Sequence, residues 1–281
     1  MAARKGNGIG ISTLIFVVFV LSIILSNLPK SHHQNTGKNA SNGTKDYQIQ
    51  FSDQFKPGLA SQDDLGLSVC IAIDCSGSMS DVPAGSPADG KRKYQMASES
   101  LTEIVSFLED YFQHQTGKDK MQLKIALLKF SSDVTELFPL RSMDKDAFRD
   151  LKAITGNPDS FTPDGQTAIG MTMERAVEIL SQSGTIFRTM IIITDGENNV
   201  GVEPETVMKA IVDNSNNKTT KDFPVSTSSI LVNFVGFDSA SSTYDSVHHL
   251  GARVTTASNK EQLNQSLKSI FVADIKNLEA K

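Results

Sequence analysis

Residues 67–79 are L-S-V-C-I-A-I-D-C-S-G-S-M, an apolar run that ends abruptly in a polar loop. The first seven positions are apolar or small and rich in Val and Ile, which is typical of a strand covered on both faces in a parallel sheet. In the loop, Asp74, Ser76 and Ser78 alternate with other residues, so an extended backbone points three oxygen-bearing side chains the same way. The pattern indicates either half of a cation site or a Ser/Gly turn after a core strand.

Strand-like and helix-like patterns alternate along the rest of the chain. Apolar runs predict further strands at residues 121–130, 134–140, 190–194, 230–235 and 253–255. Helical stripes are predicted at residues 96–112, 144–151, 168–180, 204–212, 244–250 and 263–271, with Asp144 as a cap and Ser258-x-x-Glu261 as a capping box. This order predicts an α/β, Rossmann-like fold of three layers, whose central sheet is mainly parallel with one antiparallel edge strand.

Composition limits the classes of function. The chain has 281 residues, 39% of them hydrophobic, which is enough for one well-cored domain and an appendage. A net charge of −5 and the lack of a basic cluster beside aromatic residues argue against a nucleic-acid partner. Cys70 and Cys75 are too far apart along an extended chain to form a disulfide, so we expect both to serve packing.

The N-terminal region has the features of a membrane anchor. Residues 9–28 contain no charged side chain over about the twenty positions that a spanning helix needs. We therefore predict a short cytoplasmic N-terminus at 1–8, a transmembrane signal-anchor at 9–28 and a polar tether at 29–64. Arg4 and Lys5 favour a cytoplasmic N-terminus, which places the domain at the cell surface or in the periplasm. The alternative is secretion after signal cleavage.

Oxygen-bearing side chains also occur at two later places in the chain. Asp195 directly follows the predicted strand 190–194, and Thr167 directly precedes the helical stripe 168–180. Ligands of parallel α/β sheets bind at the carboxyl ends of the strands, so we expect these residues to lie near Asp74. Taken alone, Thr167 is more typical of a helix cap.

These segments together resemble a known family. Asp74-x-Ser76-x-Ser78, then Thr167, then Thr194-Asp195-Gly196 are similar, in this order, to the metal-ion-dependent adhesion site of the von Willebrand factor A domain. The resemblance implies such a domain over residues 65–281. It implies that Ser76, Ser78 and, when ligand is bound, Thr167 touch the cation, and that Asp74 and Asp195 act directly or through water. The stretch T-P-D-G-Q-T departs from the family, which more often has two glycines before the threonine.

The donor types indicate which cation and which partner to expect. Oxygen ligands alone suit Mg²⁺, with Mn²⁺ able to substitute, better than Zn²⁺, which prefers nitrogen and sulfur. Because neutral hydroxyls supply much of the coordination, the ion keeps positive charge that attracts an Asp or Glu of a protein partner. The nearby acids Asp81, Asp164 and Glu197 are expected to be solvated loop residues.

Two functions remain open on this evidence. The first is a membrane-anchored adhesion or protein-binding module, and the alternative is an assembly or chaperone subunit that works with an ATPase or a secretion or pilus apparatus. An enzyme is not expected, because Ser76 and Ser78 lie outside any G-x-S-x-G motif and no histidine lies near a motif as a base.

Overall fold

The computed structural model of the protein describes residues 66–87, 90–114, 121–216 and 230–279, together with residues 47 and 49. The predicted cytoplasmic N-terminus (1–8) and transmembrane segment (9–28) lie outside the described residues, as does the tether (29–64) apart from residues 47 and 49. Within the described ranges, no helix is long and apolar enough to cross a membrane.

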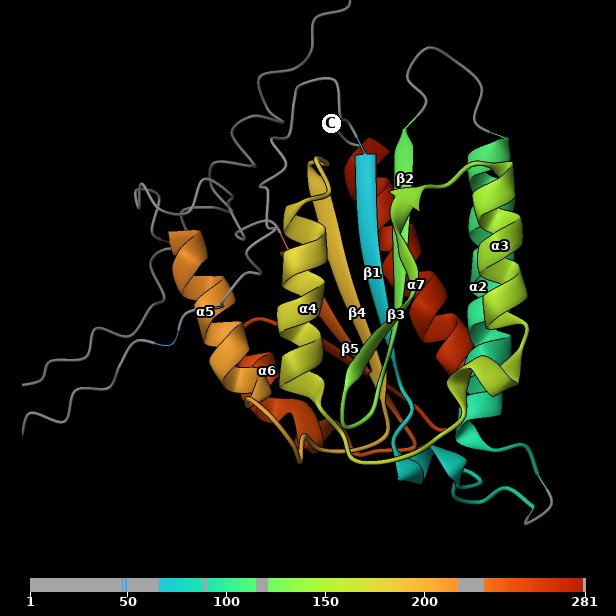
Figure 1. The fold of residues 1–281 in the computed structure, drawn as a ribbon, viewed down its shortest axis with the longest axis vertical. Coiled ribbons are helices and arrows are strands. Elements are labelled where there is room, and N and C mark those ends of the chain that lie inside the picture. The colour runs from blue at the N-terminus through green and yellow to red at the C-terminus, as the bar shows by residue number, and fades with distance from the viewer. Residues whose placement is uncertain are drawn as a thin grey trace, which may run out of the picture. The chain divides into compact units, whose positions relative to one another are not determined.

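A six-stranded sheet with the order β3-β2-β1-β4-β5-β6 forms the centre of the domain (Figure 1). Neighbouring strands are parallel, except for the antiparallel pair β2 and β3. The mainly parallel sheet with one antiparallel edge strand is thus confirmed. The strands are β1 (Gly66–Asp74), β2 (Gln122–Phe130), β3 (Val134–Ser142), β4 (Phe187–Thr194), β5 (Ile230–Phe237) and β6 (Arg253–Ala257).

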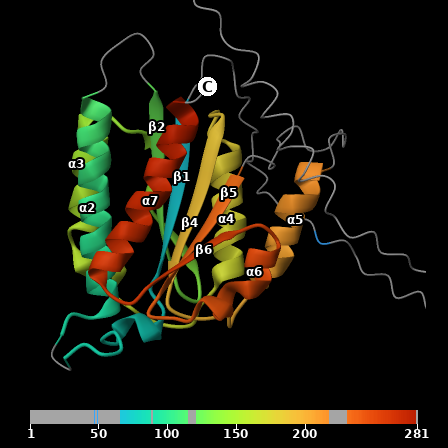
Figure 2. The same cartoon turned by 180° about the vertical axis from the view of Figure 1, so that it is seen from behind.

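Helices cover both faces of the sheet, which gives the three predicted layers (Figures 1 and 2). One face carries α2 (Lys93–Gln113), α3 (Lys145–Thr155) and α7 (Lys260–Glu279), and Figure 2 shows α7 beside α2. The other face carries α4 (Ile169–Ser181), α5 (Pro204–Asn216) and α6 (Asp245–His249). Short 3₁₀ helices are η1 (Gly77–Ser80), η2 (Pro158–Phe161) and η4 (Ser241–Tyr244).

Strand β1 lies in the middle of the core, and all nine of its residues are buried. Successive side chains of a strand point to opposite faces. Val69 and Ile71 accordingly pack in the cluster under α2 and α7, whereas Cys70 and Ala72 pack in the cluster under α4 and α5. The continuous apolar run, without polar alternation, is therefore explained by burial on both faces.

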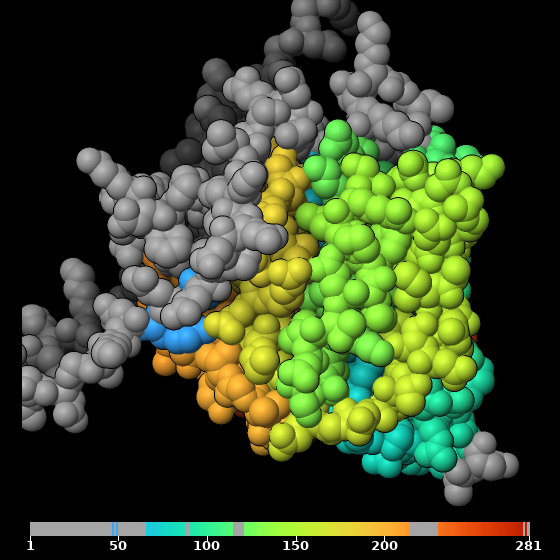
Figure 3. Space-filling view, in the orientation of Figure 1, coloured from blue at the N-terminus to red at the C-terminus, as the bar shows by residue number. Residues whose placement is uncertain are grey.

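Strand β3 closes one edge of the sheet, and in Figure 3 its green surface lies between the yellow α4 and the lime α3. Its residues are half-buried or exposed except for Phe138. Pro139 lies in this strand, where a missing backbone N–H is tolerated because the outer side has no neighbouring strand.

Capping residues define how two helices begin. Asp144 accepts a hydrogen bond from the Ala147 N–H at 2.8 Å, which confirms it as the cap of α3. The capping box predicted for the last helix at Ser258 is wrong by one residue. The Asn259 side chain accepts from the Gln262 N–H at 2.9 Å, and the Gln262 side chain accepts from the Ser258 N–H at 2.8 Å.

Candidate metal centre

The strand order places the candidate site at a topological switch point. From β1 the chain continues into α2 on one face of the sheet, and from β4 it continues into α5 on the other face. The loops after these two adjacent strands therefore diverge, and such a point is where α/β sheets bind ligands. Ile73 of β1 pairs with Ile193 of β4, so Asp74 and Thr194 follow side by side. In Figure 1 both strands end at the lower edge of the sheet.

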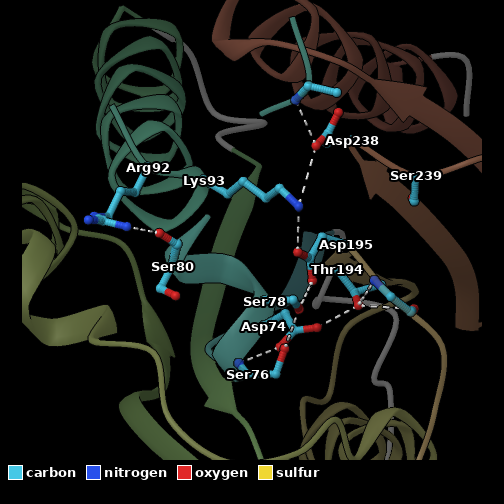
Figure 4. Close-up of polar contacts among 12 residues, drawn as sticks. Asp74, Ser76, Ser78, Ser80, Arg92, Lys93, Thr194, Asp195, Asp238 and Ser239 are labelled. Atoms are coloured by element: carbon cyan, nitrogen blue, oxygen red, sulfur yellow. Dashed lines mark hydrogen bonds and ion pairs between the residues drawn. The ribbon is translucent and has the colours of Figure 1, made fainter. Parts of the chain in front are cut away.

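Asp74 lies at the end of β1, beside Ser76 and Ser78 (Figure 4), and it is fully buried. Its Oδ1 accepts the Ser76 N–H at 2.7 Å, and its Oδ2 accepts the Thr194 hydroxyl at 2.6 Å. Burial raises the pKa of this carboxyl from 3.8 to about 6, although both hydrogen bonds lower it and the negative charge of Asp195 raises it further. Asp74 is therefore an acid held in place at an energetic cost to the fold.

Ser76, Ser78 and Asp195 form a chain of close oxygen atoms. The hydroxyls of Ser76 and Ser78 are 3.2 Å apart, and Ser78 donates to Asp195 Oδ1 at 2.7 Å. Ligands at about 2.1 Å from Mg²⁺ in an octahedron stand about 3.0 Å from their neighbours. The two observed distances lie on either side of this value, so the three oxygens fit adjacent positions around one such ion.

Thr167 is held at the site by its backbone. Its N–H donates to the Asn199 side chain at 2.7 Å, and its carbonyl accepts the Asn199 N–H at 3.0 Å. Its loop also contacts the β1 loop, because the Gly165 carbonyl accepts the Gly77 N–H at 3.2 Å. Thr167 is buried, with 4% of its surface exposed. Among the described residues, its hydroxyl makes no hydrogen bond with the other four predicted ligands.

Thr167 is not the cap of helix α4. The helix begins at Ile169, and the Gly170 N–H donates instead to the side chain of Asn198, at 3.2 Å. The turn before Thr167 needs glycine, since Gly165 has φ +75° and an added Cβ would lie 2.6 Å from the Ser132 hydroxyl. A single glycine at this position thus makes the turn in T-P-D-G-Q-T.

Lys93 and Asp238 belong to the site but were not predicted from the sequence. The Lys93 ammonium lies 2.9 Å from Asp195 Oδ2 and 3.4 Å from Asp238 Oδ2. Burial disfavours its charge, but the hydrogen bond and charge of Asp195, together with Asp238, raise the Lys93 pKa above its ordinary value. Asp238 directly follows a buried strand, as Asp195 does, and Asp74 is the last residue of another, so this placement was a usable signal. Lys93 gave none, because it follows two other basic residues that suggest a solvated turn.

Other polar and thiol groups near the site have ordinary structural roles. Asp81, Asp164 and Glu197 are exposed, as expected of solvated loop acids. Cys70 and Cys75 are free and buried, and burial raises the pKa of the Cys75 thiol to about 12. Over the described part of the chain, no group of three or more His, Cys, Asp or Glu side chains could hold a metal. A cation at this site would therefore depend on the serine hydroxyls as well as on carboxylates.

A cavity of about 260 Å³ adjoins the loop that carries Asp195. Its lining includes Phe234 and Tyr244 as well as the two acids Glu197 and Glu203. The Tyr244 hydroxyl donates to the Thr194 carbonyl at 3.3 Å, so the lining of the cavity is connected to the end of β4. Burial raises the pKa of this phenol to about 12.

Comparisons with known proteins agree on one fold. The family model described as von Willebrand factor type A domain matches residues 68–218. A search of curated proteins finds no match.

Three solved structures illustrate the likeness. A von Willebrand factor type A protein from Catenulispora acidiphila has a TM-score of 0.51 at 18% identity, over 73% of this chain and 41% of that one. The PilB minor pilin from Streptococcus sanguinis has a TM-score of 0.57 at 14% identity, and the match covers 78% of this chain and 63% of the pilin. The proximal thread matrix protein 1 from the mussel byssus, whose metal-ion-dependent adhesion site (MIDAS) motif is occupied by zinc, has a TM-score of 0.50 at 21% identity. The match covers 73% of this chain and 44% of the mussel protein. The match thus spans less than two thirds of each of these proteins, and at these identities it shows the fold alone.

Proposed function

The chain belongs to the von Willebrand factor type A domain family, and from this premise we propose that it binds a protein partner through a divalent cation held by Asp74, Ser76, Ser78, Thr167 and Asp195. The partner presents an Asp or Glu side chain to that cation. The function is binding rather than catalysis. The domain is extracytoplasmic and anchored by residues 9–28.

The observation that supports this proposal is the spacing of the three oxygens of Ser76, Ser78 and Asp195. The Ser78 hydroxyl oxygen lies 3.2 Å from that of Ser76 and 2.7 Å from Asp195 Oδ1, where the loops that follow β1 and β4 meet. Hydroxyl and carboxylate oxygens are hard ligands, which favours Mg²⁺ or Mn²⁺. Their positions are fixed before any ion arrives, because each oxygen is already in a hydrogen bond with the next.

The chain's own residues orient the ligands. Asp74 accepts the Ser76 N–H and so fixes the turn that presents the Ser76 hydroxyl. Asp195 accepts a hydrogen bond from the Ser78 hydroxyl, which directs the lone pairs of the hydroxyl oxygen away from Asp195. The bound ion supplies positive charge that neutral hydroxyls leave largely uncompensated, and this charge attracts a carboxylate of the partner.

A titration of the metal-free, full-length protein with Mg²⁺ tests the cation site. Isothermal calorimetry should detect one site, and Ser78→Ala should weaken binding by at least about tenfold because one ligand is lost. Ser80→Ala is a matched control, since the Ser80 hydroxyl in the same 3₁₀ helix donates to the Gly77 carbonyl at 2.7 Å instead. Mn²⁺ and Zn²⁺ are titrated in parallel, because zinc occupies the corresponding motif in the mussel protein. Equal binding by both variants would show that Ser78 is no ligand.

A capture experiment separates adhesion from assembly. The immobilised protein is exposed to extracts in Mg²⁺ or in chelator, and the recovered proteins are identified. Cell-surface or matrix proteins that depend on Mg²⁺ and are lost with Ser78→Ala support a binding module. Recovery of an ATPase instead supports the role of an assembly subunit.

A further inference from the structure

Lys93 places a buried positive charge directly behind the candidate cation site. It lies in the first turn of α2, where its N–H donates to the Asp81 carbonyl at 2.9 Å. Its side chain is only 9% exposed, and its ammonium is 2.9 Å from Asp195 Oδ2 (Figure 4). A lysine this deeply buried is uncommon unless it is paired. The burial of Lys93 therefore indicates a role other than that of a solvated surface charge.

The two carboxylate oxygens of Asp195 face different partners. Oδ1 accepts the Ser78 hydroxyl at 2.7 Å, and Oδ2 accepts from Lys93 at 2.9 Å. The Asp195 side chain is fully buried, so water does not compete for either oxygen. With Oδ2 engaged by the ammonium, Asp195 has one oxygen on the side of the serines.

Asp238 holds the ammonium from the opposite side. Its Oδ2 lies 3.4 Å from Lys93 Nζ and also accepts the Ala84 N–H at 3.1 Å. Asp238 has a φ of +57°, a left-handed backbone conformation that non-glycine residues seldom adopt, and its N–H donates to the Ala257 carbonyl at 2.7 Å. The ammonium is therefore fixed between the carboxyl ends of β4 and β5. It cannot leave without exposing two unpaired carboxylates.

The positive charge of Lys93 has opposite effects on the two things that the site binds. It repels a divalent cation, and it partly neutralises the Asp195 carboxylate that would otherwise bind that cation more strongly. The net charge of the site with its cation bound is therefore one unit more positive with Lys93 present than it would be without it. An incoming carboxylate is attracted by that charge.

We propose that Lys93 is a positioning residue that keeps Asp195 a one-oxygen ligand and shifts the site from tight cation binding towards capture of the partner's acid. This inference rests on the proposed function. It predicts that removal of the ammonium strengthens cation binding and weakens binding of a carboxylate. A purely structural role predicts that both weaken together, since a disordered site loses both.

The test uses Lys93→Met in the full-length protein, with Lys91→Met as the matched control. Lys91 is 58% exposed and pairs with Glu99, away from the site. Mg²⁺ affinity is measured by calorimetry, and acetate affinity is measured by water-proton relaxation of the Mn²⁺-loaded protein. Lys93→Met should bind Mg²⁺ at least about tenfold tighter and acetate several-fold more weakly, whereas Lys91→Met should match the unchanged protein.

Two further variants keep the test decisive. Lys93→Arg retains the charge and should restore both affinities towards the unchanged protein. Lys93→Met combined with Asp238→Asn removes one of the two carboxylates that Lys93→Met leaves without a counter-charge, so it covers the case in which the single variant does not fold. Parallel loss of both affinities, or no change in either, overturns the role of Lys93 alone. Failure of the unchanged protein to bind Mg²⁺ overturns the proposed function as well.

Discussion

Replacement of Asp74 by Asn should stabilise the metal-free protein at neutral and higher pH while abolishing cation binding. Asp74 is fully buried, and burial raises its pKa from 3.8 to about 6. At 1.36 kcal/mol for each tenfold change in proton affinity, ionisation of this group lowers the free energy of unfolding by about 3 kcal/mol at pH 8. Asn is uncharged, so the variant escapes this loss.

The amide can also keep the hydrogen bonds of the carboxyl. Its oxygen can accept the Ser76 N–H, which now donates to Asp74 Oδ1. Its NH₂ can donate to the Thr194 hydroxyl oxygen, whose proton can turn towards the Gly196 carbonyl, 3.4 Å away. The gain in stability at pH 8 should therefore be about 1–3 kcal/mol, the upper figure being the full cost of ionisation.

The sign of the pH dependence distinguishes this explanation from a general packing effect. Because the folded-state pKa of Asp74 is raised, its contribution to stability is complete below pH 3.8 and is lost as the pH rises through about 6. Urea unfolding in the presence of chelator should give the variant the higher free energy of unfolding at pH 8. Near pH 4.5 the free energies of the two proteins should differ by no more than about 1 kcal/mol. Added Mg²⁺ should raise the stability of the unchanged protein but not that of the variant.

Asp144→Asn is the control for this experiment. Asp144 caps α3 through the Ala147 N–H, and Asn caps a helix about as well as Asp. Its stability should stay near that of the unchanged protein at both pH values. If Asp74→Asn instead lost stability at pH 8, or if Mg²⁺ still stabilised it, Asp74 could not be a costly carboxylate retained for a cation.

Three other substitutions test the supporting structure. Gly165→Ala should lower the free energy of unfolding by about 1–2 kcal/mol, because φ is +75° and the added Cβ would lie 2.6 Å from a serine hydroxyl. Chemical denaturation should show a smaller loss for Gly196→Ala, whose added Cβ would have no atom within 4 Å. Asp274 is buried and accepts the Thr189 hydroxyl at 2.7 Å, and burial raises its pKa. Its stabilising contribution is therefore lost as the pH rises above 3.8, so Asp274→Asn should flatten the pH dependence of urea unfolding, and an unchanged slope would contradict this. Tyr244→Phe should cost about 1 kcal/mol in thermal unfolding through the lost hydrogen bonds to carbonyls at the end of β4, with no loss if water replaces the hydroxyl.

Much of the fold could be predicted because the apolar composition of the strands indicates that they are buried. Residues 67–73 are apolar or small and residues 190–193 are apolar, and each run lies in a central strand with helices on both faces. The antiparallel edge could be predicted from the short polar connection between residues 130 and 134, which is too short for a crossover helix. Helix ends were less predictable. The start of α7 depends on whether Ser258 or Asn259 captures a backbone N–H, and both residues are good caps.

The carboxylates of the site could be predicted for the same reason. A polar residue at the end of a buried parallel strand, or directly after it, must lie at the carboxyl edge of the sheet, so Asp74 and Asp195 had one possible location. Thr167 was harder to place, because its position depends on a loop held by the Asn199 side chain and by the turn at Gly165. These contacts join segments far apart in sequence, and no local pattern specifies them.

Lys93 illustrates a kind of residue that local patterns cannot reveal. The chain leaves the site after Ser78 and returns to it at the start of α2, where the Lys93 N–H donates to the Asp81 carbonyl. Only this closure brings the ammonium to Asp195, since the sequence alone gives three consecutive basic residues with no indication of which one is buried. Charge in the sequence predicts solvation on average, but a charge that is 9% exposed is kept by its partners. The residues that tune such a site are therefore found by following the partners of its carboxylates, not by extending its motif.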